Sequence, residues 1–383
     1  MKIAFAVSVF FEFGGVQRDL LRIAKECRRR GHEVHVFTGQ WDAPREPGIH
    51  IHELDTWALS NHARNARLGR QVQAAVKAAG DFDCVVGFTK LPGLDIYYGG
   101  DPCFAARLAD EKPGFYRWLP RYRAFLAQET AVFKAGGDTE ILLIAHDEAE
   151  RFKGYYGTEP ARLHLLPPGL NRERLFKDVP DEAGRRALRS EFYLGNDDFL
   201  ILNIGSRFRT KGVDRMLLAL QALPAELQAR SALVVVGGDR AAPYLKLAKR
   251  LGIADRVFFP GARDDVARFY YAADLLLHPA YTENTGTTLL EAIACGLPVL
   301  ATENCGYAFH VRKAGAGLIC PLPFNQPVLN RLLVEGLTSG ERAVWRANGP
   351  AYCAKADLYR LIERAADIIL ERAASNRRKK ISY

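Results

Sequence analysis

The stretch YTENTGTTLLEAIACGLPVLAT, residues 281–302, carries two glutamates eight positions apart, Glu283 and Glu291. Glu283 lies in a turn rich in glycine and threonine, and Glu291 lies on a helix predicted to begin just after Gly286. A helix N-terminus offers free N–H groups and about half a positive charge, so it binds phosphate readily, and carboxylates accept hydrogen bonds from hydroxyls. The pattern indicates a ligand that combines a diphosphate with sugar hydroxyls. The alternative is that Glu283 only complements the helix dipole and that Glu291 is an ordinary helical residue.

A second group of charged side chains lies in NIGSRFRTKGVDR, residues 203–215. Arg207, Arg209 and Lys211 follow an apolar run that predicts a buried strand. Fixed cations at such a place can neutralise a diphosphate leaving group, and arginine can bind it through two hydrogen bonds. The alternative is a solvated basic loop, but a position at the end of a strand favours a functional role.

A glycine pair, Gly14-Gly15, lies in EFGGVQRD, residues 12–19, between the apolar run KIAFAVSVF and a helical pattern. These glycines let a ligand lie against backbone amides, although a plain tight turn would use them equally. Asp19 follows in the first turns of the predicted helix, where an acid is also favoured structurally. The spacing is not the GxGxxG of dinucleotide-binding proteins, which argues against an NAD-dependent oxidoreductase.

An aromatic-basic segment spans residues 104–129, FAARLADEKPGFYRWLPRYRAFLAQE. Basic residues beside Trp and Tyr are typical of a segment that lies on an anionic membrane surface. The alternatives are an ordinary amphipathic core helix and a stacking platform for single-stranded nucleic acid. The residues expected at a membrane surface are Arg117, Trp118, Arg121, Tyr122 and Arg123.

Composition limits the function classes. The chain has 383 residues and a formal net charge of +9, which favours anionic partners. Seven scattered cysteines form no CxxC pair and no Cys/His cluster with metal-ligand spacing, so we expect reduced thiols in the cytosol. No run of about 18 apolar residues predicts a membrane span, and the apolar start of the chain fits a buried strand better than a signal peptide.

Apolar runs alternate with helical patterns along the whole chain, which predicts parallel sheets covered on both faces. A segment rich in proline, glycine and charge, residues 167–196, separates two such sets. We therefore expect two doubly wound α/β domains that face each other across a cleft. The first is placed at 1–170 and the second at 171–364, with a helix over about 365–383 as a candidate to pack back on the first. Ligands bind such sheets at the carboxyl ends of strands.

These motifs together resemble the retaining nucleotide-sugar glycosyltransferases of GT-B architecture, family four. The two glutamates followed by AIACGLPVLAT, the glycine pair and the loop GSRFRTKG occur in that family's order, so the resemblance covers nearly the whole chain. Within the family, GGVQRDLLRIA, FTKLPGLDIYY and the aromatic-basic segment ending in RYR are similar to transferases that add glucose to an inner-core heptose of lipopolysaccharide.

The resemblance implies UDP-glucose as donor, a lipid-linked heptose as acceptor, an α-linked product and no metal or other cofactor. It also implies a cytoplasmic enzyme, peripheral on the anionic inner-membrane surface, with no nucleic acid partner. Lys211, Glu283, Asp19 and Arg207 are the expected catalytic residues. The expected donor-binding residues are Gly15, Arg174, Arg207, Arg209, Lys211, Gly261, Arg263, Glu283, Asn284, Thr285, Gly286, Thr287 and Glu291.

Their implied roles differ. Glu291 is assigned to the ribose hydroxyls, and Glu283 with the backbone of residues 284–287 to the hexose. Lys211 and one of Arg207 or Arg209 are assigned to the diphosphate.

Three further positions follow from the same resemblance. Gly15 is expected to touch the donor, Asp19 to face the acceptor or the sugar, and residues 261–263 to lie near the uracil. Two readings remain open beside this one. The first is a transferase for another UDP-sugar and acceptor, and the second is a basic membrane- or nucleic-acid-binding protein without chemistry.

Overall fold

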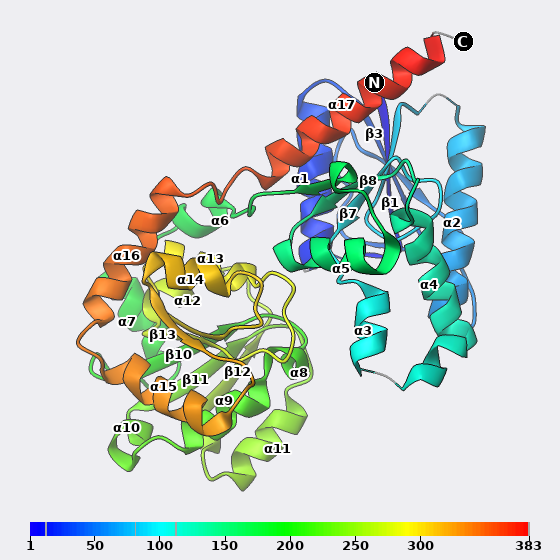
Figure 1. Ribbon diagram of the computed structural model, residues 1–383. Helices are drawn as coiled ribbons and strands as arrows, with labels where there is room; N and C mark the ends of the chain where they lie inside the picture. Colours follow the sequence, from blue (N-terminus) through cyan, green and yellow to red (C-terminus); the bar gives the residue numbers. More distant parts are fainter. Residues whose placement is uncertain (12–13, 81, 112, 382–383) are drawn as a thin grey trace. The chain divides into compact units, whose positions relative to one another are not determined.

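The computed structural model describes residues 1–11, 14–80, 82–111 and 113–381. It divides into two compact units (Figure 1). Unit 1 comprises Met1–Gly169 and Arg360–Tyr383, and unit 2 comprises Leu170–Tyr359. Unit 1 is therefore discontinuous in sequence, and unit 2 is inserted into it.

Unit 1 is built on a sheet of seven parallel strands in the order β5-β3-β1-β6-β7-β8-β9. The strands are β1 Lys2–Val7, β3 Glu33–Thr38, β5 His50–Glu53, β6 Cys84–Gly87, β7 Ile96–Gly99, β8 Glu140–Leu143 and β9 Leu163–Leu165. A small parallel pair joins β2 Phe10–Phe11 to β4 Trp41–Asp42. The register pairs each residue of β1 with the residue 31 positions later in β3, from Lys2 with Glu33 to Val7 with Thr38.

Helices cover both faces of this sheet. On one face, Ile3 and Phe5 of β1 pack with α1 and α17, which run side by side (Figure 1). On the other face, Ala4 and Ala6 pack beneath α2, α4 and α5. The helices are α1 Gly15–Arg29, α2 Asn61–Ala78, α3 Phe104–Glu111, α4 Pro120–Phe133, α5 His146–Tyr156 and α17 Leu361–Ile381, with short 3-10 turns η1 Gly114–Trp118 and η2 Pro160–Arg162.

Unit 2 has a sheet of six parallel strands in the order β12-β11-β10-β13-β14-β15. The strands are β10 Phe199–Ile204, β11 Ser231–Val236, β12 Val257–Gly261, β13 Leu275–His278, β14 Val299–Thr302 and β15 Gly317–Cys320. Its strand residues are almost all buried, as expected for parallel strands covered on both faces.

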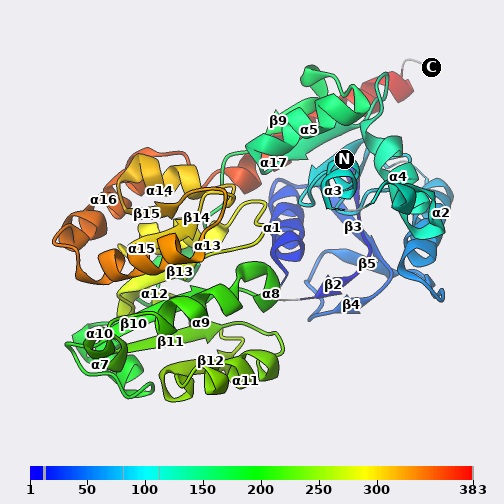
Figure 2. The ribbon, with the colours of Figure 1, turned by 60° about the horizontal axis from the view of Figure 1, so that its bottom comes forward.

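The helices of unit 2 lie on both faces of its sheet. In Figure 2, α9 and α15 lie together on one face, where Met216 and Leu333 share a core. The bounds are α6 Arg172–Phe176, α7 Glu182–Ser190, α8 Phe208–Lys211, α9 Val213–Gln221, α10 Ala225–Ala229, α11 Ala242–Arg250, η3 Ala254–Arg256, α12 Val266–Ala272, α13 Thr287–Ala294, α14 Ala308–Ala314, α15 Gln326–Thr338 and α16 Arg342–Lys355.

The doubly wound α/β architecture of both halves was predicted from the sequence and is confirmed. Within the two large sheets, three strands, β5, β7 and β15, were not predicted from the sequence. Their sequences, HIHE, IYYG and GLIC, are four residues long and contain histidine, tyrosine or glycine, so they lack a continuous aliphatic run. Among the described residues, no helix has both the length and the apolar character needed to cross a bilayer.

Candidate active site

Glu283 lies at the centre of a largely buried polar cluster in unit 2. Strand β13 ends at His278, and the loop that follows brings Glu283 back over the strand end. Nε2 of His278 lies 3.1 Å from Oε2 of Glu283, and Nζ of Lys211 contacts the same oxygen. Lys211 ends helix α8, which follows strand β10. The structure thus brings together two residues that the sequence placed on separate strand ends.

The charges in this cluster are set by burial and by the close cation. Burial alone would raise the pKa of Glu283, but the hydrogen bond from His278 and the charge of Lys211 outweigh it and lower the pKa to about 2. Burial lowers the pKa of His278. Glu283 is therefore an anion and His278 is a neutral donor near pH 7.

Asn203 on β10 fixes the orientation of the His278 ring. Its amide nitrogen donates to the Leu277 carbonyl at 2.9 Å and lies 3.3 Å from Nδ1 of His278. With Nδ1 as the acceptor, the proton of the neutral ring sits on Nε2 and points at Glu283. The carboxylate is thus held from one side by a fixed donor and from the other by a cation.

The loop between Glu283 and helix α13 is shaped by two glycines. Gly286 precedes the helix with φ 82°, a left-handed conformation that favours glycine. Gly306 supports the loop from below, because a Cβ there would lie 2.0 Å from the Asn284 carbonyl oxygen. The amide of Tyr307 also donates to the Thr285 carbonyl at 2.7 Å. The helix N-terminus that begins at Thr287 is therefore held beside Glu283.

Glu291, one turn into α13, is buried and held at both carboxylate oxygens. The hydroxyl of Tyr270 donates to Oε2 at 2.6 Å, and Nη1 of Arg174 lies 3.2 Å from Oε1. The hydroxyl of Tyr270 has its pKa raised by burial and by the Glu291 charge. These contacts exclude the reading of Glu291 as an ordinary surface residue.

Arg207 adopts a left-handed backbone, with φ 60° and ψ 61°, at the start of α8. A non-glycine residue in this region costs on the order of 1–3 kcal/mol and persists where the surroundings enforce it. The surroundings here include Asp239, whose Oδ2 accepts from the Phe208 amide at 2.7 Å. Arg207 and Arg209 are both exposed, so both guanidinium groups reach solvent from this loop.

The expected uracil region lies at the end of β12. Gly261 has φ 79°, and no atom lies within 4 Å of the position that its Cβ would occupy. Arg263 is engaged differently, because it makes two hydrogen bonds of 2.8 Å to Asp265. The space beside the Gly261 backbone is therefore open to a uracil ring, whereas the Arg263 side chain is engaged with Asp265.

In unit 1, Gly15 is the first residue of α1, and the space where its Cβ would lie is open for 4 Å. Asp19, one turn on, accepts from the Tyr98 hydroxyl at 2.7 Å and lies 3.9 Å from Arg22. Burial raises the pKa of Asp19, against the lowering effects of Tyr98 and Arg22. Residues 12–13 of the glycine-pair segment lie outside the described residues.

Two family models match this chain. Glycosyltransferase Family 4 matches residues 13–174, and Glycosyl transferases group 1 matches residues 185–350. The lipopolysaccharide glucosyltransferase WaaG of Escherichia coli (strain K12) is 40% identical over 96% of this chain and 98% of its own length. The chain belongs to the family of this glucosyltransferase.

The solved structures agree with this membership. A crystal structure of WaaG, a glycosyltransferase involved in lipopolysaccharide biosynthesis, matches 96% of this transferase and 99% of that chain with a TM-score of 0.91. A D-inositol 3-phosphate glycosyltransferase of Xylanimonas cellulosilytica is 34% identical over 90% of this chain and 91% of its own length. The GT-B fold, the transferase class and the likeness to a lipopolysaccharide glucosyltransferase, all expected from the sequence, are confirmed.

More distant structures share the fold. The Anabaena protein HepE in complex with UDP-glucose is 19% identical, with a TM-score of 0.74, and the match covers 97% of this chain and 99% of that one.

The aromatic-basic segment of the transferase is partly packed and partly open. Its ends form α3 and α4, where Phe104 lies 5.9 Å from the Tyr122 ring. The middle, around η1, leaves Phe115 62% and Trp118 72% exposed. Arg117, Arg121 and Arg123 are exposed as well, and Lys112 lies outside the described residues. The middle of the segment therefore presents two large aromatic side chains to the solvent.

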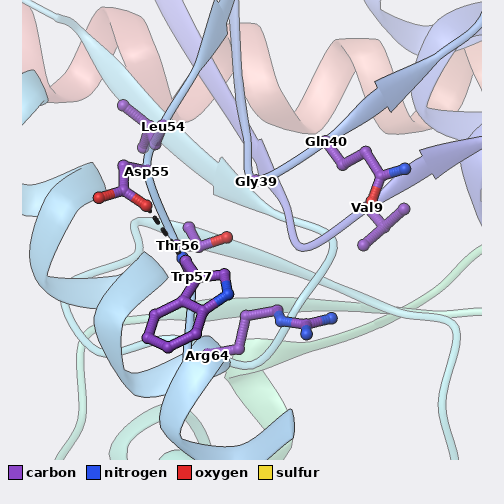
Figure 3. A pocket seen from close by; sticks show the side chains of 8 residues that line it. All are labelled: Val9, Gly39, Gln40, Leu54, Asp55, Thr56, Trp57 and Arg64. Carbon is purple, nitrogen blue, oxygen red and sulfur yellow. Dashed lines mark hydrogen bonds between the residues drawn. The ribbon is translucent and has the colours of Figure 1, made fainter. Parts of the chain in front are cut away.

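A hollow of about 290 Å³ lies at the carboxyl ends of β1, β3 and β5 in unit 1 (Figure 3). Gln40 and Trp57 line it from loops, and Arg64 lines it from α2. Asp55 fixes the loop, because its Oδ1 accepts from the Trp57 amide at 3.1 Å. The lining combines one large aromatic ring with several polar groups.

Sequence reasoning missed three residues of the site. His278 was given no role, although its place at the end of an apolar run was a usable signal. Asn203 is the only polar residue of the run FLILNI, which marks it as a buried donor. Tyr270 carried no signal, because only the packing of α12 against α13 reveals its contact with Glu291.

Proposed function

We propose that this transferase moves glucose from UDP-glucose to an inner-core heptose of lipopolysaccharide with retention of configuration. The observation that carries the proposal is the contact of Lys211 with Glu283 beside the N-terminus of α13. Cation, helix end and carboxylate together match a donor that joins a diphosphate to a sugar. WaaG is a lipopolysaccharide glucosyltransferase, which supports this donor sugar and acceptor, and the complex of HepE with UDP-glucose supports the nucleotide-sugar donor.

In the proposed mechanism, Lys211 and Arg207 receive the charge that grows on the leaving diphosphate. Arg207 precedes and Lys211 ends the short helix α8, and the N–H groups at Thr287 add partial positive charge. Such preorganised groups stabilise a transition state because they need no reorganisation during the reaction. Arg207 is preferred over Arg209 because its strained backbone is held in place at that loop.

Glu283 would accept hydroxyl hydrogen bonds from the hexose. Both of its donors, Lys211 and His278, contact Oε2, so within the described contacts Oε1 keeps its lone pairs for a ligand. Glu291 would take the ribose hydroxyls in place of Arg174, while Tyr270 keeps the carboxylate oriented.

The acceptor hydroxyl would enter on the face that the diphosphate leaves, which preserves configuration, and the departing phosphate would take its proton. Glu283 is unsuited to act as a nucleophile, because its charge is already neutralised by Lys211. No double displacement is required. We also propose that transfer needs no metal, since Lys211 and Arg207 flank α8, where we place the diphosphate.

The acceptor is proposed to contact the hollow at Trp57. An aromatic face with a few polar groups suits a sugar ring, and Arg64 suits an anionic substituent on it. Trp57→Ala should raise the KM for the acceptor and leave the KM for UDP-glucose unchanged. Equal changes in both would remove this assignment.

The decisive experiment supplies purified protein with UDP-glucose and a lipopolysaccharide that ends at the inner-core heptose. Glucose should appear on the acceptor with an α linkage, and an acceptor without heptose should receive none. A panel of UDP-sugars tests the alternative donor, and one assay in excess EDTA tests the metal. Absence of transfer with every donor would favour the non-enzymatic binding protein.

Peripheral attachment to an anionic membrane surface is part of the same proposal. Phe115 and Trp118 would insert at the interface while the neighbouring arginines meet the headgroups. The double substitution F115S/W118S should weaken binding to vesicles that contain anionic lipid. Tyr155, an aromatic residue 49% exposed on α5, provides the matched control Tyr155→Ser, which should bind as wild type.

A further inference from the structure

The edge of the unit 1 sheet carries three histidines and a carboxylate. Strands β3 and β5 are parallel, and their register pairs His35 with His50 and Phe37 with His52. Glu33 stands two positions before His35 on β3, so both side chains lie on the same face of the sheet. The sequence predicted no metal-ligand cluster, because Glu33 and His35 lie in EVHVFT and His50 lies in HIHE, which form separate strands.

These side chains are close enough to share a ligand. Nε2 of His35 lies 2.7 Å from Oε1 of Glu33, and Nδ1 of His35 lies 2.8 Å from Nε2 of His52. The rings of His35 and His50 stack with centroids 4.6 Å apart. One potential ligand atom each of Glu33, His35 and His50 all lie within 4.8 Å of one another.

The spacing fits a small first-row cation. A tetrahedral zinc ion with bonds of about 2.0–2.1 Å holds its ligands roughly 3.4 Å apart. Small side-chain rotations would bring the three ligand atoms to that separation. Two imidazoles and one carboxylate select borderline metals such as zinc, cobalt or nickel, whereas calcium and magnesium prefer oxygen ligands.

His52 provides the outer partner that metal-bound histidines usually have. If His35 binds a metal through Nε2, its Nδ1–H can donate to Nε2 of His52, which fixes the ring. Glu33 and His50 are exposed, which gives a cation access from solvent.

One neighbouring charge opposes binding. Nζ of Lys2 lies 3.9 Å from Oε1 of Glu33 and 4.7 Å from the centre of the Phe82 ring. Lys2 thus competes with a metal for the same carboxylate. This makes Lys2 a position where substitution should strengthen, rather than weaken, the site.

We propose that Glu33, His35 and His50 form a binding site for one divalent cation of the zinc type at the edge of the unit 1 sheet. A bound ion would join edge strand β5 to β3. The site is independent of the transferase chemistry, since none of its residues is among those assigned to donor or acceptor. It would therefore stabilise unit 1 without supplying a catalytic group.

The test uses full-length protein without a histidine tag, stripped with EDTA and then dialysed. Titration with Co²⁺, followed by its visible absorption, and with Zn²⁺ by calorimetry should each show one ion per chain. All seven cysteines are buried, so thiols should not contribute ligands in the folded protein. His50→Ala and Glu33→Gln alter exposed positions and should each weaken binding at least about tenfold, a loss typical even of outer partners.

Two matched variants complete the design. His146→Ala removes a largely exposed histidine of the same unit outside the cluster and should bind as wild type. Lys2→Met should bind more tightly than wild type. Zinc should raise the thermal midpoint of the wild type but not of His50→Ala. Substoichiometric or multi-site binding in the wild type, or unchanged binding in both His50→Ala and Glu33→Gln, would overturn the proposal.

Discussion

Each unit contains a glutamate paired with a lysine, fully buried in unit 1 and partly accessible in unit 2, and the two pairs differ in which groups donate to the other lone pairs of the carboxylate. In unit 1, Glu129 is fully buried and accepts from the amides of Phe104 and Ala105 at 2.8 and 2.9 Å, from Lys90 at 2.5 Å and from the Tyr156 hydroxyl at 2.7 Å. These amides belong to the first turn of α3, where backbone N–H groups have no acceptor within the helix.

In unit 2, the donors that the described residues supply to Glu283 are the side chains of Lys211 and His278, and both contact one oxygen. Side chains of the pair remain partly accessible, 17% for Lys211 and 13% for Glu283. The comparison indicates that a buried ion pair whose carboxylate also accepts from backbone amides serves to hold the fold together. A pair in which one carboxylate oxygen accepts no described hydrogen bond, and in which the cation is accessible, can bind a substrate.

The largest expected effect breaks the structural pair. Lys90→Met should lower the free energy of unfolding of unit 1 by about 3–5 kcal/mol, because the buried charge of Glu129 loses its counter-ion. Urea unfolding measures this change. Lys153→Met, which breaks an exposed pair with Glu150, is the control and should change stability by less than about 1 kcal/mol. If Lys90→Met lowers the free energy of unfolding as little as Lys153→Met does, the contact of Lys90 with Glu129 is not the structural ion pair that distinguishes Glu129 from Glu283.

The next effect concerns the proposed catalytic pair. Lys211→Ala should reduce kcat by about 10²–10³, because one preorganised cation is lost from the transition state. Its unfolding free energy should fall less than that of Lys90→Met, since His278 still donates to Glu283. Lys246→Ala, at an exposed position of α11, should match wild type in both measurements. Turnover near wild type in Lys211→Ala would remove the electrostatic part of the mechanism.

A smaller effect separates Arg207 from Arg209. Arg207→Gly should lower kcat/KM for UDP-glucose by about 10–100-fold, the equivalent of one charge-assisted hydrogen bond of roughly 1.5–3 kcal/mol. The same change should raise stability by about 1 kcal/mol, because glycine relieves the left-handed backbone. Arg209→Ala should alter activity less. The reverse ranking in steady-state kinetics would assign the diphosphate to Arg209.

The smallest effect is the pH dependence of unit 2. Burial lowers the pKa of His278 below its ordinary 6.5, so the unfolded chain takes up this proton first as pH falls. Stability from the neutral ring is therefore complete above about pH 6.5 and declines below it. Glu283, with its pKa lowered to about 2, adds a second loss between its ordinary 4.5 and about 2.

His278→Gln keeps a donor for Glu283 but removes the titration. Its urea midpoint should decline less than that of the wild type between pH 6.5 and 4.5, where the remaining decline includes His310, whose pKa burial lowers to about 4. Parallel profiles for the two proteins would show that His278 does not titrate in this range.

The fold could be predicted from the sequence because the long strands of both sheets are buried on both faces. They therefore appear as continuous aliphatic runs that alternate with helical patterns. The site followed in part. Glu283, Lys211 and Glu291 were found because they stand at strand ends or on the helix that follows.

The partners of these residues were not found, since His278, Asn203 and Tyr270 act through contacts across strands and helices that spacing along the chain does not encode. The histidine cluster escaped for the same reason. Its side chains come together only when strands β3 and β5 pair in the observed register.

The insertion of unit 2 into unit 1 has a consequence for synthesis. The amide of Leu170 donates to the Leu358 carbonyl at 2.9 Å, so the chain enters and leaves unit 2 at one place. Unit 2 can therefore complete its fold on the ribosome while unit 1 still lacks α17, whose Ile362 and Ile369 fill the core beside α1. The N-terminal half must wait, with an apolar face uncovered, until residues 361–381 emerge, and that interval is when a chaperone would be most needed.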